Sequence, residues 1–258
     1  MTSESILLIG RETRNAREVF ATQATRLAAL TSVETIEVAT YEEEPIRELR
    51  DQLQGITADR VYAVPMCTAH THDTLNDVPA VLSYVPGEVY YCDPVGGSPA
   101  VTGAIEARAA ARVPPADDVT LVLVGFGSSS KPHHRRTADY HAARIREGAD
   151  YGDVVTCYLL QNPAVECVRY NIATDRAVAV PLFLSRSAAT EESIPAELEL
   201  DRGGLVYTDP LGDHPRIADA VHAEVERQRA LASADGLASP SLVRGEEHRP
   251  VATDGEGL

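Results

Sequence analysis

One short segment of the sequence gathers side chains that bind divalent metals and exchange protons. It reads Met66-Cys-Thr-Ala-His-Thr-His-Asp73 and contains a thiol, the imidazoles of His70 and His72, and the Asp73 carboxylate. Such groups bind Co²⁺, Ni²⁺, Fe²⁺ and Zn²⁺, and a neutral imidazole also accepts a proton near pH 7. The segment therefore predicts a metal site with His70, His72 and Asp73 as ligands, in which His70 and His72 are also the catalytic residues.

Plainer interpretations of the same segment stay open. A His-x-His pair at a turn is also typical of surface polar residues, with Asp73 capping the helix that follows. Cys67 is also typical of a small buried packing residue. The four cysteines form no Cys-x-x-Cys pair, so neither a zinc ribbon nor a disulfide framework is predicted.

A second segment has the composition of an anion-binding loop. It reads Gly125-Phe-Gly-Ser-Ser-Ser130, and glycines followed by hydroxyl residues at a helix start can hold an anion with backbone N–H groups. The spacing is not that of a Walker A loop. A basic run follows, made of Lys131, His133, His134, Arg135 and Arg136. We predict substrate-binding residues in this loop, namely Gly125, Phe126, Gly127, Ser128 and Ser129; an exposed, charge-rich first helical turn is the alternative.

The sequence contains an internal repeat. Residues 64–79 align without gaps on residues 180–195, and residues 93–99 align on residues 209–215, in both cases 116 positions later. The opening apolar runs, which end at Gly10 and Gly125, agree to within one residue of that offset. A repeat determines the architecture before any local prediction does. We predict an N-terminal repeat over 1–113, a C-terminal repeat over 118–231, and a disordered acidic tail over 232–258.

Each repeat alternates short apolar runs with helix-like segments. This order is typical of an α/β fold in which a parallel sheet is flanked by helices. Strands are expected near 6–9, 33–38, 60–64 and 88–91, and again near 120–124, 153–158, 177–184 and 204–207; helices are expected near 14–30 and 137–147. Ligands of such sheets bind at the carboxyl ends of the strands. The loops that follow the strands are therefore the segments expected to bind a ligand.

Composition excludes several kinds of partner. The formal net charge of −16 disfavours nucleic acid and anionic membrane surfaces. No apolar stretch approaches the roughly 20 residues that a membrane-spanning helix needs, and the first residues lack a signal-peptide pattern. We expect a cytoplasmic protein that is a monomer or a homodimer.

The same motifs resemble a known family, the CbiX/SirB-type sirohydrochlorin chelatases. Residues 180–185 and 207–215 look like family blocks, and residues 121–128 are similar to the family's G-H-G-S motif with its preceding strand. Ala69-His70, followed by Asp77-Val-Pro79, resembles the block A-H-G-x-H-x-x-x-D-I-P. The resemblance spans roughly residues 5–229, which is both repeats.

The resemblance implies a class II chelatase that needs no nucleotide and no obligatory cofactor, and whose two repeats face each other across a cleft. Such an enzyme inserts Co²⁺, the first choice here, or Fe²⁺ or Ni²⁺ into sirohydrochlorin, for cobalamin or siroheme biosynthesis. By the same resemblance His70 is a metal-binding or proton-accepting residue. The family's second histidine of that block falls on Asp73, with His72 one place earlier.

The chain departs from the family pattern at three positions. Arg11 and Phe126 replace the histidines of the two G-H-G-S motifs, and Arg186 stands at the position that matches His70. We predict that these three residues bind substrate. The departures keep two other functions open: a non-catalytic carrier of tetrapyrrole or metal, and an enzyme that uses the loop 125–130 on another anionic small molecule.

Overall fold

Two four-stranded parallel sheets form the framework of the protein. The computed structural model describes residues 2–235. The first sheet contains β1 (Glu4–Arg11), β2 (Thr35–Tyr41), β3 (Arg60–Pro65) and β4 (Glu88–Tyr91), in the order β2-β1-β3-β4. The second contains β5 (Val119–Gly125), β6 (Asp153–Tyr158), β7 (Arg176–Pro181) and β8 (Leu205–Tyr207), in the matching order β6-β5-β7-β8. The predicted fold class and the repeat are thus confirmed.

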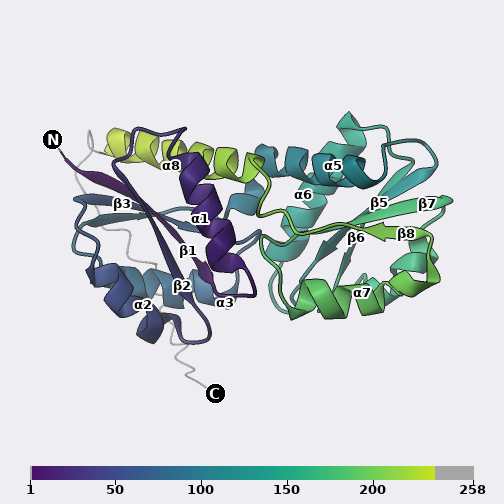
Figure 1. The fold of residues 1–258 in the computed structure, drawn as a ribbon, viewed down its shortest axis with the longest axis horizontal. Helices are drawn as coiled ribbons and strands as arrows, with labels where there is room; N and C mark the ends of the chain where they lie inside the picture. The colour runs from purple at the N-terminus through teal and green to yellow at the C-terminus, as the bar shows by residue number, and fades with distance from the viewer. Residues whose placement is uncertain (1, 236–258) are drawn as a thin grey trace, which may run out of the picture.

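Helices cover both faces of each sheet (Figure 1). The first repeat supplies α1 (Ala16–Leu27), α2 (Pro45–Gln54), α3 (His72–Leu75), α4 (Asp77–Val81) and α5 (Pro99–Arg112). The second supplies α6 (His133–Gly148), α7 (Ile194–Glu197) and α8 (Arg216–Asp235). Short helical turns lie at η1 (Leu82–Tyr84), η2 (Val95–Gly97), η3 (Val165–Asn171), η4 (Ala189–Ser193) and η5 (Leu200–Arg202). Among the described residues, no helix combines the length and the apolar character needed to span a membrane.

Several predicted boundaries differ from the structure. The strand expected to reach residue 184 ends at Pro181, because the chain then turns toward the other repeat, where the Thr68 hydroxyl donates to the Leu182 carbonyl over 2.8 Å. The helix expected from residue 137 already begins at His133. Residues 232–235 of the predicted tail continue α8, and 236–258 lie outside the described residues.

The strands form because their side chains are buried on both faces. All seven residues of β5 are buried, and Ile6–Ile9 of β1 are at most 1% exposed. Continuous apolar runs of this kind are typical of parallel sheets that are covered on both sides. One hydrophobic cluster runs through both repeats, whereas the opposite face of each sheet has a cluster of its own. The two repeats therefore share part of one core.

The last helix of each repeat packs on the sheet of the other repeat. Helix α5 contacts β7 and α6 of the second repeat, whereas α8 contacts α1 and β3 of the first. Figure 1 shows α8 lying with α1 over the first sheet, and α5 lying with α6 over the second. We call β1–β4 with α1–α4 and α8 the first lobe, and β5–β8 with α5–α7 the second lobe. The lobes differ from the sequence repeats in these two exchanged helices, α5 and α8.

Two equivalent glycines allow the chain to pass close to itself within the shared core. A Cβ atom on Gly96 would lie 1.8 Å from the Thr68 carbonyl oxygen, and one on Gly212 would lie 1.8 Å from the Leu184 carbonyl oxygen. These glycines occupy matching positions of the two repeats. Both carbonyls belong to loops that follow a third strand, so each glycine sets the position of one such loop.

A buried histidine joins the two lobes. His141 of α6 is 0% exposed; its Nε2 donates to the Gly96 carbonyl over 2.7 Å, and its Nδ1 accepts from the Thr102 hydroxyl over 2.8 Å. This tautomer follows because a carbonyl oxygen can only accept. Burial lowers the pKa of His141 to about 4, so the ring is neutral in the folded protein near pH 7.

We expect Gly96→Ala to destabilise the protein by about 3 kcal/mol, because the added methyl group meets a backbone oxygen that cannot retreat without moving the loop. Urea unfolding measures the change. Gly97→Ala is the matched control, since a Cβ atom there has no neighbour within 4 Å. Equal stability of the two variants would contradict the close approach.

His141 should make stability depend on pH. Its pKa is lower in the folded than in the unfolded chain, so the unfolded chain binds more protons below about pH 6.5 and the stabilisation is lost as the pH falls. Between about pH 7 and about pH 5 the wild type should lose about 2 kcal/mol more unfolding free energy than His141→Leu. Urea unfolding of both proteins at each pH checks this. Equal losses of unfolding free energy in the two proteins would show that the pKa of His141 is the same in the folded and the unfolded chain.

Candidate active site at the cleft between the lobes

A cleft of about 510 Å³ lies between the lobes, at the carboxyl ends of the strands. The first lobe lines it with residues 9–11 and 13, Tyr41, and residues 66–69 and 71–74. The second lobe lines it with Phe126, His134, and residues 182–185 and 187–189. Hydroxyl groups of Thr13 and Ser185 meet across the lobe boundary at 2.7 Å. The cleft therefore lies where a parallel sheet is expected to bind its ligand.

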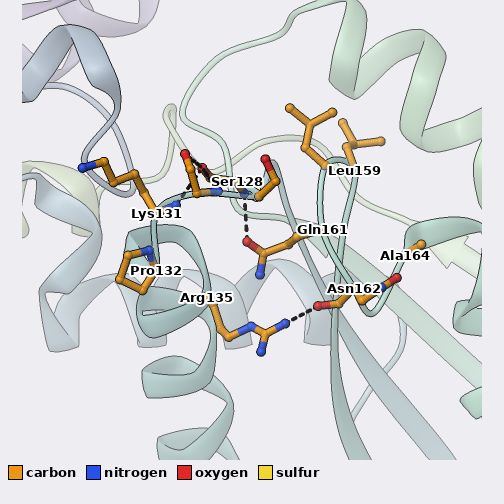
Figure 2. A pocket seen from close by; sticks show the side chains of 11 residues that line it. Ser128, Lys131, Pro132, Arg135, Leu159, Gln161, Asn162 and Ala164 are labelled. Atoms are coloured by element: carbon orange, nitrogen blue, oxygen red, sulfur yellow. Dashed lines mark hydrogen bonds between the residues drawn. The ribbon is translucent and has the colours of Figure 1, made fainter.

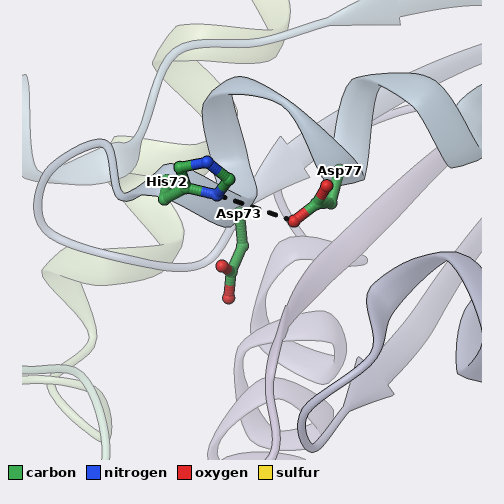
Figure 3. Close-up of side chains that lie close together, drawn as sticks. All are labelled: His72, Asp73 and Asp77. Atoms are coloured by element: carbon green, nitrogen blue, oxygen red, sulfur yellow. Dashed lines mark ion pairs between the residues drawn. The ribbon is translucent and has the colours of Figure 1, made fainter.

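The first lobe brings an imidazole and two carboxylates together beside this cleft. His72, Asp73 and Asp77 each offer a ligand atom, and these atoms all lie within 4.8 Å of one another. The His72 Nδ1 lies 3.7 Å from an Asp77 carboxylate oxygen. Figure 3 marks this contact between the two side chains. The Tyr41 hydroxyl donates to Asp73 over 3.3 Å and so orients that carboxylate. Nitrogen and oxygen donors in this arrangement suit a borderline divalent cation.

The backbone around these ligands is fixed by a helix cap. The Thr71 side chain accepts from the Thr74 N–H over 3.3 Å, and the Thr74 hydroxyl accepts from the Thr71 N–H over 2.8 Å. The Tyr91 hydroxyl donates to the Thr74 carbonyl over 2.7 Å. The residue that caps this helix is thus Thr71, and the alternative in which Asp73 is the cap is wrong.

The structure separates His70 from His72. The His70 Nε2 lies 3.8 Å from an Asp93 oxygen, and its Nδ1 lies 3.3 Å from the Thr74 hydroxyl. Its ring meets the His133 ring edge to face at 5.6 Å, and burial lowers its pKa. His70 is not among the described residues that line the cleft. The two histidines face different surroundings because the cap at Thr71 changes the chain direction between them.

An ion pair occupies the equivalent place in the second repeat. Arg186 matches His70 and contacts Asp209 at 3.0 Å, just as His70 faces Asp93. The Arg186 backbone N–H also donates to the Asn15 side chain over 2.7 Å. Arg186 lines a separate cavity of about 440 Å³ rather than the cleft. The structure therefore places this predicted substrate-binding residue in a contact between the lobes.

Backbone N–H groups of the predicted anion-binding loop donate to side chains of the protein itself. The Ser128 N–H donates to the Gln161 side chain over 2.8 Å, and the Ser128 hydroxyl accepts from the N–H groups of Ser130 and Lys131 over 3.3 and 3.1 Å. Ser128 and Ser129 line another cavity, of about 740 Å³, on the second lobe (Figure 2). Among this loop's five predicted substrate-binding residues, Phe126 alone lines the cleft.

The glycines of this loop place Phe126 there. Gly125 ends β5 against the Tyr158 ring, where a Cβ atom would lie 2.8 Å from a ring carbon. Gly127 has a φ of 83°, a backbone conformation that favours glycine. Arg11, the equivalent of Phe126 in the first repeat, also lines the cleft, and its Nε donates to the Glu42 carbonyl over 2.8 Å.

Phe126, Phe183 and His134 form an aromatic wall on the second lobe, which the sequence predicted only in part. The Phe126 and Phe183 rings meet edge to face at 6.3 Å, and the His134 ring lies 6.1 Å from Phe126. Phe126 is 39% exposed, a high value for a side chain of this kind. The basic run pointed to His134, but no periodicity distinguished it from its neighbour His133, which does not line the cleft.

The fold and this cleft define a class of α/β proteins with two lobes, each built on a four-stranded parallel sheet. SirB from Bacillus subtilis, solved with Fe³⁺, superposes with a TM-score of 0.71 at 21% identity, over 90% of this chain and 98% of that chain. A multi-domain Deinococcus radiodurans protein, described as structurally similar to chelatases, gives 0.73 at 21% identity, over 87% of this chain; this chain spans 55% of it. These likenesses concern the fold.

Sequence comparison gives the family. The CbiX family profile matches residues 5–112 and 120–228, so both repeats match it and the chain belongs to the CbiX family. It is 27% identical over 224 residues to a Halobacterium salinarum protein named probable sirohydrochlorin cobaltochelatase, covering 71% of this chain and 76% of that protein. A sirohydrochlorin cobaltochelatase of Methanothermobacter thermautotrophicus is 26% identical over 131 residues, covering 42% of this chain and 91% of that protein.

We expect Co²⁺ to bind at His72, Asp73 and Asp77 without pigment. His72→Gln and Asp73→Asn should each weaken Co²⁺ binding about tenfold or more, because each removes a ligand from a small set. Calorimetric titration with cobalt chloride measures this. His70→Gln is the matched control and should leave the Co²⁺ affinity nearly unchanged. A loss of Co²⁺ affinity equal to that of His72→Gln would show that His70 is also a ligand.

Proposed function

We propose that this protein inserts a divalent metal ion, Co²⁺ in the first place and Fe²⁺ or Ni²⁺ as alternatives, into sirohydrochlorin without a nucleotide. One observation carries the proposal: a single cleft has metal-binding side chains on one wall and aromatic side chains on the other. Membership of the CbiX family and the names of the relatives support it. The reaction serves cobalamin or siroheme biosynthesis and takes place in the cytoplasm.

The first lobe supplies the wall that presents the metal. His72 and Asp73 line the cleft, and Asp77 adds a carboxylate from the start of α4. The His72 side chain is 78% exposed, so an ion from solvent reaches it directly. Co²⁺ is the substrate here and must leave its ligands again, and a small, open set of donors suits a transient cation better than an enclosed site with four ligands.

The second lobe supplies the wall that binds the pigment. Phe126 and Phe183 present apolar surface to a flat macrocycle, and a cleft of about 510 Å³ falls within the usual range of about 300–1,000 Å³ for ligand sites. Arg11 lies across from them on the first lobe and suits the carboxylates at the edge of sirohydrochlorin, since guanidinium groups pair with carboxylates in two parallel hydrogen bonds.

The other predicted site residues lie around the cleft and its loops in this proposal. His70 lies outside the cleft, beside Thr74 and Asp93, and Arg186 ties the loop 182–189 to Asn15 of the first lobe. Ser128 closes the turn before α6 by accepting two N–H groups. Gly125 and Gly127 orient the Phe126 side chain. Ser129 lines the separate cavity of about 740 Å³ on the second lobe.

The test mixes purified protein, sirohydrochlorin and Co²⁺, and follows the absorbance of the ring, with Fe²⁺ and Ni²⁺ in parallel. The wild type should insert metal faster than a protein-free control. Asp73→Asn should lower the rate about tenfold or more through the metal, and Phe126→Ala should weaken pigment binding roughly tenfold, because stacking on an aromatic ring is worth about 1–3 kcal/mol.

The same experiment separates the carrier function from catalysis. Tight pigment binding without any acceleration would contradict the chelatase and favour a tetrapyrrole carrier. Absence of both pigment and metal binding would contradict both, and would favour an enzyme that acts on another anionic molecule.

A further inference from the structure

Metal insertion needs a proton acceptor as well as a metal site. This inference rests on the proposed function, in which each turnover replaces two pyrrole N–H protons by one divalent ion. A proton and a cation compete for the same nitrogen lone pair, and they repel each other. The N–H bond therefore tilts away from the incoming ion, so that the acceptor belongs on the wall opposite the metal.

Most titratable groups in the cleft are unsuited to this step. Those of the first lobe are Arg11, Tyr41, Cys67, His72 and Asp73. A guanidinium has no lone pair to offer. Burial raises the pKa of the Cys67 thiol to about 12 and raises that of Tyr41, so both already carry their protons at neutral pH. The remaining two hold the metal in the proposal.

The second lobe contributes one titratable side chain to the lining of the cleft, among the described residues. This residue is His134, the second residue of α6, and its ring lies 6.1 Å from the Phe126 ring within the aromatic wall. No described residue forms a hydrogen bond with either of its ring nitrogens. A neutral imidazole in this position has one lone pair free to accept a proton from a ring stacked on the same wall.

We propose that His134 is the base that accepts the pyrrole protons, from the face of the macrocycle opposite His72 and Asp73. One N–H bond breaks, its electron pair stays on the pyrrole nitrogen and forms the bond to the metal, and the proton bonds to the imidazole. The imidazolium releases that proton to water at the open side of the cleft. The second N–H proton then follows the same route, which accounts for both protons and the two charges of the ion.

The surroundings of His134 favour the neutral form of its ring, which can accept a proton. Burial, followed by the nearby His133, lowers the pKa of His134 below its usual value, so the ring is unprotonated near pH 7. The other groups of its wall, Phe126 and Phe183, do not titrate. The nearby titratable group is His133 on α6, and the titratable and charged groups that line the same cleft from the first lobe are Arg11, Tyr41, Cys67, His72 and Asp73.

The experiment compares His134→Gln with the wild type and with His133→Gln in the full chain. Glutamine keeps a polar side chain but cannot accept a proton, so kcat for Co²⁺ insertion should fall about 100-fold, as for the loss of a general base. Pigment affinity, measured by fluorescence titration, should stay within about twofold. His133→Gln is the matched control, because its neighbouring ring faces His70 and does not line the cleft.

The pH profile of kcat gives a readout that a packing role would not change. The wild-type rate should rise with pH through the pKa of His134, below about pH 6.5, and this limb should be absent in His134→Gln. As a second variant, His134→Ala should regain activity when imidazole is added to the solution.

Three results would overturn the assignment. They are an unchanged kcat in His134→Gln, retention of the low-pH limb in that variant, and an equal loss in His133→Gln. A wild type that binds pigment and metal but never inserts the ion would overturn the proposed function itself, and the proton acceptor with it. An active wild type with an active His134→Gln variant would overturn the proton acceptor alone.

Discussion

The packing of the two lobes against each other decides where each side chain of the cleft lies. Helices α5 and α8 exchange lobes, and a single hydrophobic cluster runs through both. The close approach of Gly96 to the Thr68 carbonyl, and of Gly212 to the Leu184 carbonyl, holds one loop of each repeat at the cleft. Because interiors are close-packed, neither loop can shift without disturbing the shared core. Such rigidity suits a site that must present a metal to a flat ring.

Duplication has produced two similar lobes with different chemistry. Tyr91 and Tyr207 donate to equivalent carbonyls, those of Thr74 and Thr190, so the frame around each third-strand loop has been kept. The side chains that could bind a metal have not been kept, since residues 188 and 189 are alanines where the first repeat has the His72 imidazole and the Asp73 carboxylate. The first lobe carries His72, Asp73 and Asp77, and the second lobe carries the aromatic wall. A cleft between unlike walls can treat the two faces of one macrocycle differently, which two identical walls could not do.

The distribution of charge in the protein agrees with two lobes of different chemistry. Its excess of acidic residues repels polyanions such as nucleic acids, whereas the cleft itself mixes an arginine with apolar and aromatic groups. In the proposed function, the carboxylates of Asp73 and Asp77 attract a divalent cation and repel the carboxylate-rich pigment, so the two substrates bind different walls. Burial lowers the pKa of the His134 imidazole in the aromatic wall, so that this ring is neutral near pH 7. In the proposed function, metal binding and proton acceptance fall to different lobes.

The sequence by itself determined the fold class, the repeat and the family, because a common offset of 116 positions and buried apolar runs are properties of the chain's order. It also located one loop with His72 and Asp73. Only the tertiary structure decided which neighbours share a site. His70 and His72 are two positions apart, yet the cap at Thr71 sends them to different surroundings, while Asp77 and His134 join the site from two other helices. Side-chain direction depends on caps, and contacts between lobes depend on packing, and neither is encoded in the spacing of residues along the chain.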